Sequence, residues 1–124
     1  MFVLAAAYSF LWPVTVETPD PAVPGAYLQQ TFKVRFEPLS KEQGIALDEE
    51  FRALETLEER IAHEHDLLFR TVRDWEDVVD PSTREPVPFT DENFRTAMRF
   101  PWFPTGLYRA YRDAMTGDKA RLGN

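Results

Sequence analysis

The alternation of apolar and charged residues in residues 31–37 is the feature that most limits how this chain can fold. Three apolar side chains, those of Phe32, Val34 and Phe36, are separated there by charged ones. Successive side chains of a β-strand point to opposite faces, so this strand has one apolar face and one charged face. A second layer of structure must therefore cover the apolar face.

An earlier segment is predicted to pair with this strand. Residues 11–17 alternate in the same way and place Trp12 and two valines on one face. Residues 18–25, between the two segments, contain three prolines and a glycine, which exclude regular structure. We predict an antiparallel β-hairpin over residues 10–38 with a long Pro-rich loop.

This hairpin is not expected to fold alone, because two-stranded hairpins are only marginally stable in water. Its apolar face requires helices or another sheet. Across the hairpin, Glu17 is expected to face Lys33 or Arg35. An unpaired strand edge also offers a route to self-association by strand addition.

A long helix is predicted to follow the hairpin. Ser40 and Gln43 have the spacing of a capping box, in which each side chain bonds the backbone N–H of the other residue. Apolar residues then recur at helical spacing from Leu47 onward. We expect this helix either to continue to about Val78 or to bend near its two histidines, with Trp75 on the core side.

Prolines control the remaining third of the chain. Each residue before a proline is disfavoured in a helix, so residues 85–88 are predicted to be extended. Thr90 can cap a new helix, and Phe89 and Phe94 stand at the positions of a hydrophobic staple. A last helix follows an aromatic turn and is expected to end at Gly117.

Together these elements predict one domain of the α+β class, mainly helical, with three to four helices after the hairpin. The length of 124 residues suits a single domain, and the 44% hydrophobic and 14% aromatic shares indicate a folded chain. Within residues 1–124, the expected parts are the hairpin, a helical part over residues 40–117 and a polar tail over residues 118–124.

The composition argues against several classes of function. A net charge of −7 is unsuited to a protein that binds nucleic acid through its phosphates. No apolar run approaches the ~20 residues that span a bilayer, so no membrane partner is expected. There is no cysteine, no Gly-rich phosphate loop and no nucleophile elbow. We therefore expect no catalytic site and no cofactor.

Two polar clusters are candidate sites. Of Glu59, His63 and His65, only the first two have the spacing of paired ligands on a helix, and two ligands do not complete a zinc site. Four carboxylates flank Trp75, and these are expected to be solvated or to meet a basic partner surface. No metal site is predicted.

Protein contacts are expected from the aromatic residues, because Trp and Tyr dominate interface hot spots. The predicted contact residues lie on the hairpin and after Pro101. They are Trp12, Phe32, Val34, Phe36, Trp102, Phe103 and Tyr108.

Three short motifs resemble one protein family. A W-x-x-V-x-D pattern covers residues 75–80, P-x-P-F-T covers residues 86–90, and A-Y-x-x-A covers residues 110–114. With the strand pattern near residue 32 and the charged helix after it, the chain resembles the tail assembly chaperones of long-tailed phages, prophages and gene transfer agents.

The resemblance implies a mostly helical, non-enzymatic protein that self-associates. It implies binding to the tape measure protein, recruitment of tail tube subunits, action in the cytoplasm of the bacterial host, and absence from the mature particle. Two alternatives remain open: an acidic protein-binding module or DNA mimic that occupies a nucleic-acid-binding protein, and a small hydrolase with an acidic metal site.

Overall fold

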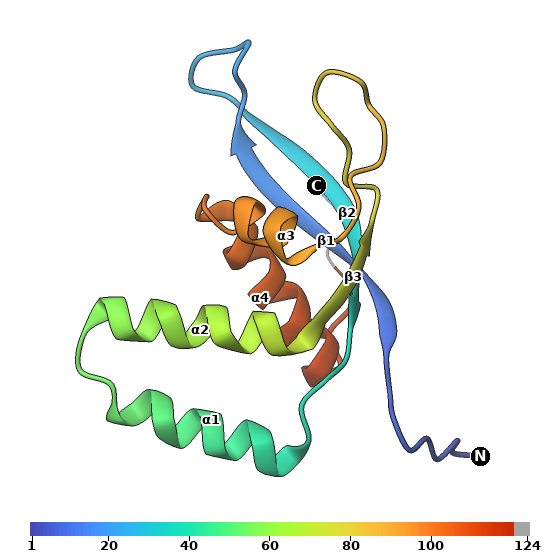
Figure 1. Cartoon of the computed structure of the whole chain (residues 1–124), viewed down its shortest axis with the longest axis vertical. Coiled ribbons are helices and arrows are strands. Elements are labelled where there is room, and N and C mark those ends of the chain that lie inside the picture. Colours follow the sequence, from blue (N-terminus) through green and yellow to red (C-terminus); the bar gives the residue numbers. More distant parts are fainter. Residues whose placement is uncertain (121–124) are drawn as a thin grey trace.

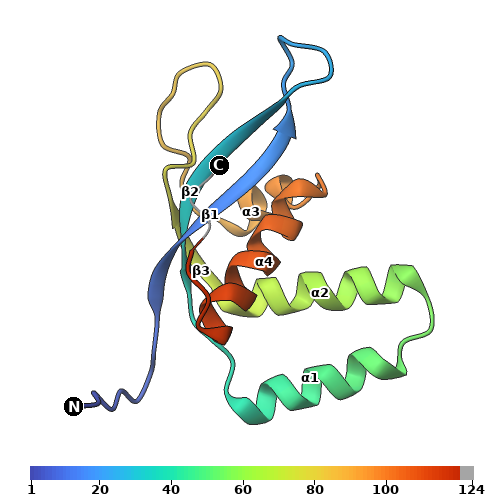
Figure 2. The same cartoon turned by 180° about the vertical axis from the view of Figure 1, so that it is seen from behind.

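A three-stranded antiparallel sheet with helices on one side forms the fold of the chain (Figures 1 and 2). The structure is a computed structural model that describes residues 1–120. The strands, in the spatial order β1-β2-β3, are β1 (Phe10–Pro19), β2 (Tyr27–Phe36) and β3 (Val72–Glu76). The helices are α1 (Lys41–Ala53), α2 (Leu57–Thr71), α3 (Asp91–Ala97) and α4 (Trp102–Thr116).

The core lies between the apolar face of the sheet and the helices, as the alternation in β2 predicted. Phe32, Val34 and Phe36 are all buried, and Val14 of β1 pairs with Phe32 in the register. The α+β class is confirmed. The buried residues of this core are Val14, Val16, Phe32, Val34, Phe36, Leu68, Val72, Trp75, Phe94, Met98, Phe103, Leu107 and Ala110.

The register of the hairpin differs from the expectation. Glu17 pairs with Gln29 rather than with Lys33 or Arg35, and the Gln29 amide lies 3.4 Å from the Glu17 carboxylate. The strands are longer than expected, because β1 extends through Pro19 and the connecting segment is only residues 20–26. A proline is tolerated at this position because β1 is an edge strand.

The long predicted helix is two helices, and the break lies at residues 54–56 rather than near the histidines. Ser40 and Gln43 do form the predicted capping box at the start of α1. A second cap then starts α2, where the Thr56 hydroxyl accepts a hydrogen bond from the Glu59 N–H at 3.1 Å. The T-x-x-E spacing of these two residues is the sequence signal for this second start.

The helix does not continue to Val78, because the chain enters β3 after Thr71. The pairing of β3 with β2 shifts at Arg73, where a β-bulge lets Val72 and Trp75 both face the core. This spacing of three residues also fits a helix, which explains the wrong prediction. The sheet therefore has a third strand, and the expected helical part over residues 40–117 is interrupted by it.

The local signals near the prolines are confirmed. Val87 donates its N–H to Val78 at 2.8 Å, so the connector is extended and lies beside the chain that leaves β3. Thr90 caps α3, and the rings of the staple pair, Phe89 and Phe94, lie 5.4 Å apart. Gly117 ends α4 with a left-handed backbone, as predicted.

Close packing of α4 on β1 gives a stability prediction. A methyl group at Gly106 would lie 2.5 Å from Cγ1 of Val16 and 3.3 Å from the Thr15 carbonyl oxygen. We expect Gly106→Ala to lower the free energy of unfolding by about 1–3 kcal/mol, because the β-branched Val16 side chain and the Thr15 backbone would have to shift. Urea unfolding measures the change.

Gly44→Ala is the matched control, because nothing lies within 4 Å of the added methyl group on α1. Alanine is the better helix former, so the free energy of unfolding of this variant should rise by about 0.5–1 kcal/mol. Equal changes in the two variants would contradict the close approach of α4 to β1.

Candidate protein-binding site

Helices α1 and α2 form an antiparallel pair that projects from the sheet, with α4 beside its base (Figure 1). Only one residue of α1 is buried, Leu47, and it lies outside the core cluster. Phe51, further along α1, is 41% exposed. The packing of α1 is therefore weak, and a space remains between α1, α2 and α4.

This space, here called the apolar groove, has a volume of about 430 Å³. Its walls come from residues far apart in the sequence. Leu47 of α1, Leu67 of α2 and Tyr111 of α4 contribute apolar side chains, while Lys41, Asp48 and Arg112 bring charge. The complete lining is Leu39, Ser40, Lys41, Gly44, Leu47, Asp48, His63, Leu67, Tyr108, Tyr111, Arg112, Met115 and Thr116.

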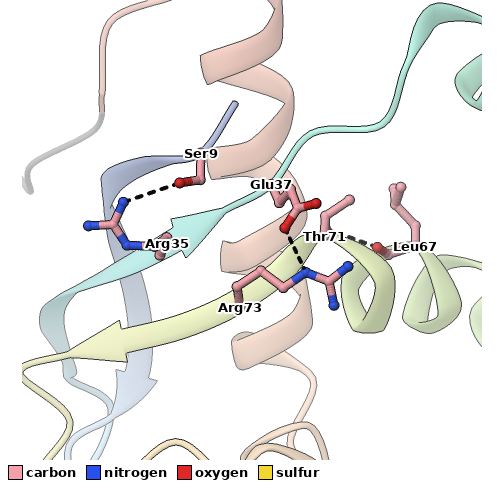
Figure 3. Close-up of polar contacts among 6 residues, drawn as sticks. All are labelled: Ser9, Arg35, Glu37, Leu67, Thr71 and Arg73. Atoms are coloured by element: carbon pink, nitrogen blue, oxygen red, sulfur yellow. Dashed lines mark hydrogen bonds and ion pairs between the residues drawn. The ribbon is translucent and has the colours of Figure 1, made fainter. Parts of the chain in front are cut away.

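Hydrogen bonds fix the end of the groove nearest the sheet, and Figure 3 shows one of these contacts, between Arg73 and Glu37. The Glu37 N–H donates to the Thr71 carbonyl at 2.7 Å, and Arg73 lies 3.2 Å from the Glu37 carboxylate. The Leu39 N–H donates to the Tyr111 hydroxyl at 3.1 Å. These bonds tie the segment that enters α1 to α2, β3 and α4, so the base of the helix pair is held in place.

The outer part of the helix pair is held by side chains. His63 of α2 lies 3.5 Å from the Glu50 carboxylate of α1, and its ring lies 5.6 Å from that of Phe51. The Arg60 guanidinium sits 5.8 Å from the Phe51 ring, a cation–π contact. These few contacts are the main ones that join the facing surfaces of α1 and α2.

Most of the net negative charge of the chain lies on this helix pair. Residues 41–71 contain nine Asp or Glu and four Lys or Arg, which gives a net charge of −5 out of −7 for the chain. The apolar groove lies beside this acidic surface, but the charged residues of its own lining are Lys41, Asp48 and Arg112. The acidic surface keeps the molecule soluble and disfavours acidic binding partners.

A second hollow, here called the N-terminal groove, adjoins the first at Met115. It has a volume of about 390 Å³ and lies between the start of β1 and the end of α4. Trp12 lines it, and its buried indole N–H has no hydrogen-bond partner within residues 1–120. The full lining is Tyr8, Phe10, Leu11, Trp12, Pro38, Ala114 and Met115.

The fold separates the seven predicted contact residues into two groups. Phe32, Val34, Phe36 and Phe103 belong to the core, so their side chains are not on the surface of the folded chain. The others lie at surfaces: Trp12 in the N-terminal groove, Tyr108 in the apolar groove, and Trp102 stacked on exposed Phe100 with ring centres 5.1 Å apart.

The polar clusters do not converge on a site. His63 faces the apolar groove, whereas His65 lines a different hollow beside α3. Backbone N–H groups of Thr83 and Ser82 bond the Asp80 carboxylate and lower its pKa. Within residues 1–120 no group of three His, Asp or Glu side chains is placed to hold a metal ion. None of the helices in this range has the length and apolar content needed to cross a bilayer.

Sequence reasoning did not identify the apolar groove. In the sequence, Leu47 belongs to the apolar stripe of the predicted long helix and Tyr111 to the A-Y-x-x-A motif, and neither pattern indicates a groove. The groove exists because α1 is folded back against α2, and that depends on the break at residues 54–56. The cap signal at Thr56 could have predicted the break, but not which residues would then face one another.

The bond between Leu39 and Tyr111 gives a prediction about stability and pH. Burial raises the pKa of Tyr111 above its ordinary value of 10.0, and the Leu39 N–H opposes this in part. The neutral hydroxyl is therefore favoured in the folded state. Its contribution to stability is complete below pH 10 and is lost as the pH rises through the higher pKa of the folded state.

We expect Tyr111→Phe to cost about 1–2 kcal/mol at neutral pH, because the Leu39 N–H loses its acceptor. Above pH 10 the difference from the unmodified chain should shrink, as measured by urea unfolding at several pH values. Tyr108→Phe, at an exposed position in the same groove, should change stability by less than ~0.5 kcal/mol. If Tyr111→Phe and the unmodified chain differed in stability by the same amount at every pH, the raised pKa of Tyr111 in the folded state would be contradicted.

Comparison with known proteins gives no match: no protein-family model, no curated protein and no solved structure matches the chain. Its function is therefore inferred from the sequence motifs and from the surfaces that the fold exposes.

Proposed function

We propose that this protein is a non-enzymatic tail assembly chaperone of a phage, prophage or gene transfer agent. It binds the tape measure protein, keeps it soluble, and helps recruit tail tube subunits during tail assembly. It acts in the cytoplasm of the bacterial host and is absent from the mature particle. The sequence motifs motivate this proposal, and the apolar groove is the observation that carries it.

The motif residues have structural roles that agree with a shared fold. The Trp75 indole donates to the Val87 carbonyl at 2.7 Å, and its ring lies 5.2 Å from that of Phe89, so the first two motifs form one unit. In the third motif Ala110 is buried in the core, and Tyr111 holds Leu39. Since these residues stabilise the fold, client contacts are expected on other surfaces.

The apolar groove supplies such a surface. A chaperone that holds an aggregation-prone chain has to cover apolar side chains, and it needs no reacting groups. The groove is lined by Leu47, Leu67 and Met115 and lies beside the acidic surface of the helix pair. An amphipathic segment of a client can place its apolar side in the groove while the acidic surroundings keep the complex soluble.

The acidic helix pair is also the feature that favours the second candidate, a DNA mimic. A mimic requires carboxylates arranged at phosphate-like spacing. Here four basic residues interrupt the carboxylates, and one of them, Arg70, pairs with Asp66 at 3.0 Å. The mixed charge and the apolar groove favour the chaperone.

Co-expression tests the proposal. The tape measure protein encoded beside this chain should be more soluble when both are produced together, and the two should co-purify. Met115→Glu should weaken co-purification about tenfold, which corresponds to about 1.4 kcal/mol, because it places a carboxylate in the apolar groove.

Tyr27→Glu is the matched control, since it adds the same charge at an exposed residue at the start of β2. It should leave co-purification unchanged, and circular dichroism should show that both variants fold. If the unmodified chain neither binds the tape measure protein nor raises its solubility, the proposed function is wrong. If the two variants behave alike, the groove is not the client site.

A further inference from the structure

The N-terminal arm, residues 1–8, is an exposed apolar segment that the core does not use. Phe2, Val3 and Leu4 are 86%, 76% and 89% exposed. The first charged side chain of the sequence is Glu17, so the arm has no charged side chain of its own. Exposed apolar segments of this kind mark a contact with another surface.

We propose that the N-terminal arm of one copy occupies the apolar groove of a second copy, in a reciprocal exchange. One chain thus carries two complementary surfaces, an apolar arm and an apolar groove, and neither is covered in the single chain. The charged residues of the groove lining are Lys41, Asp48 and Arg112, and an arm without charged side chains brings no further charge that would have to be paired there.

The direction of the arm indicates a second copy rather than the same chain. Figures 1 and 2 both show the arm leaving the sheet on the side away from α1 and α2. Contacts fix its root, where the rings of Tyr8 and Phe10 lie 6.2 Å apart and that of Phe10 lies 5.9 Å from Phe36. To enter its own groove, the arm would have to reverse the course that both figures show.

The N-terminal groove provides the path for an incoming arm. It shares the lining residue Met115 with the apolar groove, so the two hollows lie next to each other on α4. Residues 1–5 form no helix or strand, and their carbonyl groups can accept hydrogen bonds. The Trp12 indole N–H has no hydrogen-bond partner within the described residues, and because it is buried it could donate to one of these carbonyls only if the side chains around it moved.

Reciprocity enlarges the contact between the two copies. A stable interface buries about 1,200–2,000 Å² in total, more than a few arm residues provide. In a two-fold arrangement each arm-to-groove contact occurs twice, which doubles the buried area. The exchange covers the groove before any client is present, so the arm and a client would compete for the same surface.

The absence of cysteine allows a direct test with the purified chain alone. One preparation carries Leu4→Cys and a tag that changes its mass, and the other carries Gly44→Cys. Gly44 lines the apolar groove, and nothing lies within 4 Å of a side chain added there. Mixed under mild oxidation, the two should form a disulfide-linked pair with the mass of the two different chains.

The control mixture contains Ser82→Cys in place of Gly44→Cys. Ser82 lies in the exposed loop after Val79, outside the groove, so this mixture should form much less of the disulfide-linked mixed pair. Light scattering should show a dimer for the unmodified chain and a monomer for Leu4→Asp, whose exposed side chain is outside the core. No client is needed, so these results do not depend on the proposed function.

Three results would overturn the inference. The first is a monomer mass for the unmodified chain at every concentration. The second is an equal yield of mixed pairs with the control cysteine. The third is a Leu4→Cys/Gly44→Cys double variant that forms its disulfide only within one chain, which would mean that the arm occupies its own groove.

Discussion

The packing of Trp75 is the interaction on which the rest of the structure depends. The bulge at Arg73 turns this side chain into the core, where it lies opposite Val34 in the register of β2 and β3. Its ring meets Phe89 at 5.2 Å and Phe103 at 6.2 Å, so it joins the sheet to the segment before α3 and to the start of α4. One buried aromatic residue thus connects three parts of the chain that lie far apart in sequence.

Features that depend on a few neighbouring residues could be predicted from the sequence. The caps at Ser40 and Thr90 and the one-sided strand around Val34 belong to this group, because each is set by local hydrogen bonds or by alternation. The strand that contains Trp75 could not be recognised. A bulged strand and a helix both place residues three apart on one face, and only pairing with β2 decides between them.

The surfaces for binding were harder to predict than the fold. Aromatic content alone does not separate Phe36, which is buried, from Tyr108, which lines the groove. The difference arises from which helices cover the sheet and which stand away from it. Leu47 and Tyr111 are 64 positions apart by their numbers, and they share a groove because the turn at residues 54–56 brings α1 back beside α2 and α4.

Few contacts hold α1 to the rest of the molecule, so this helix can unfold locally before the others. Its one buried side chain, Leu47, and the pair formed by Glu50 and His63 are small compared with the core that holds α4 on the sheet. Local unfolding of α1 therefore needs only a fraction of the free energy of global unfolding. The groove has one wall that can move outward while the sheet remains folded, so its width can adapt to segments of different bulk.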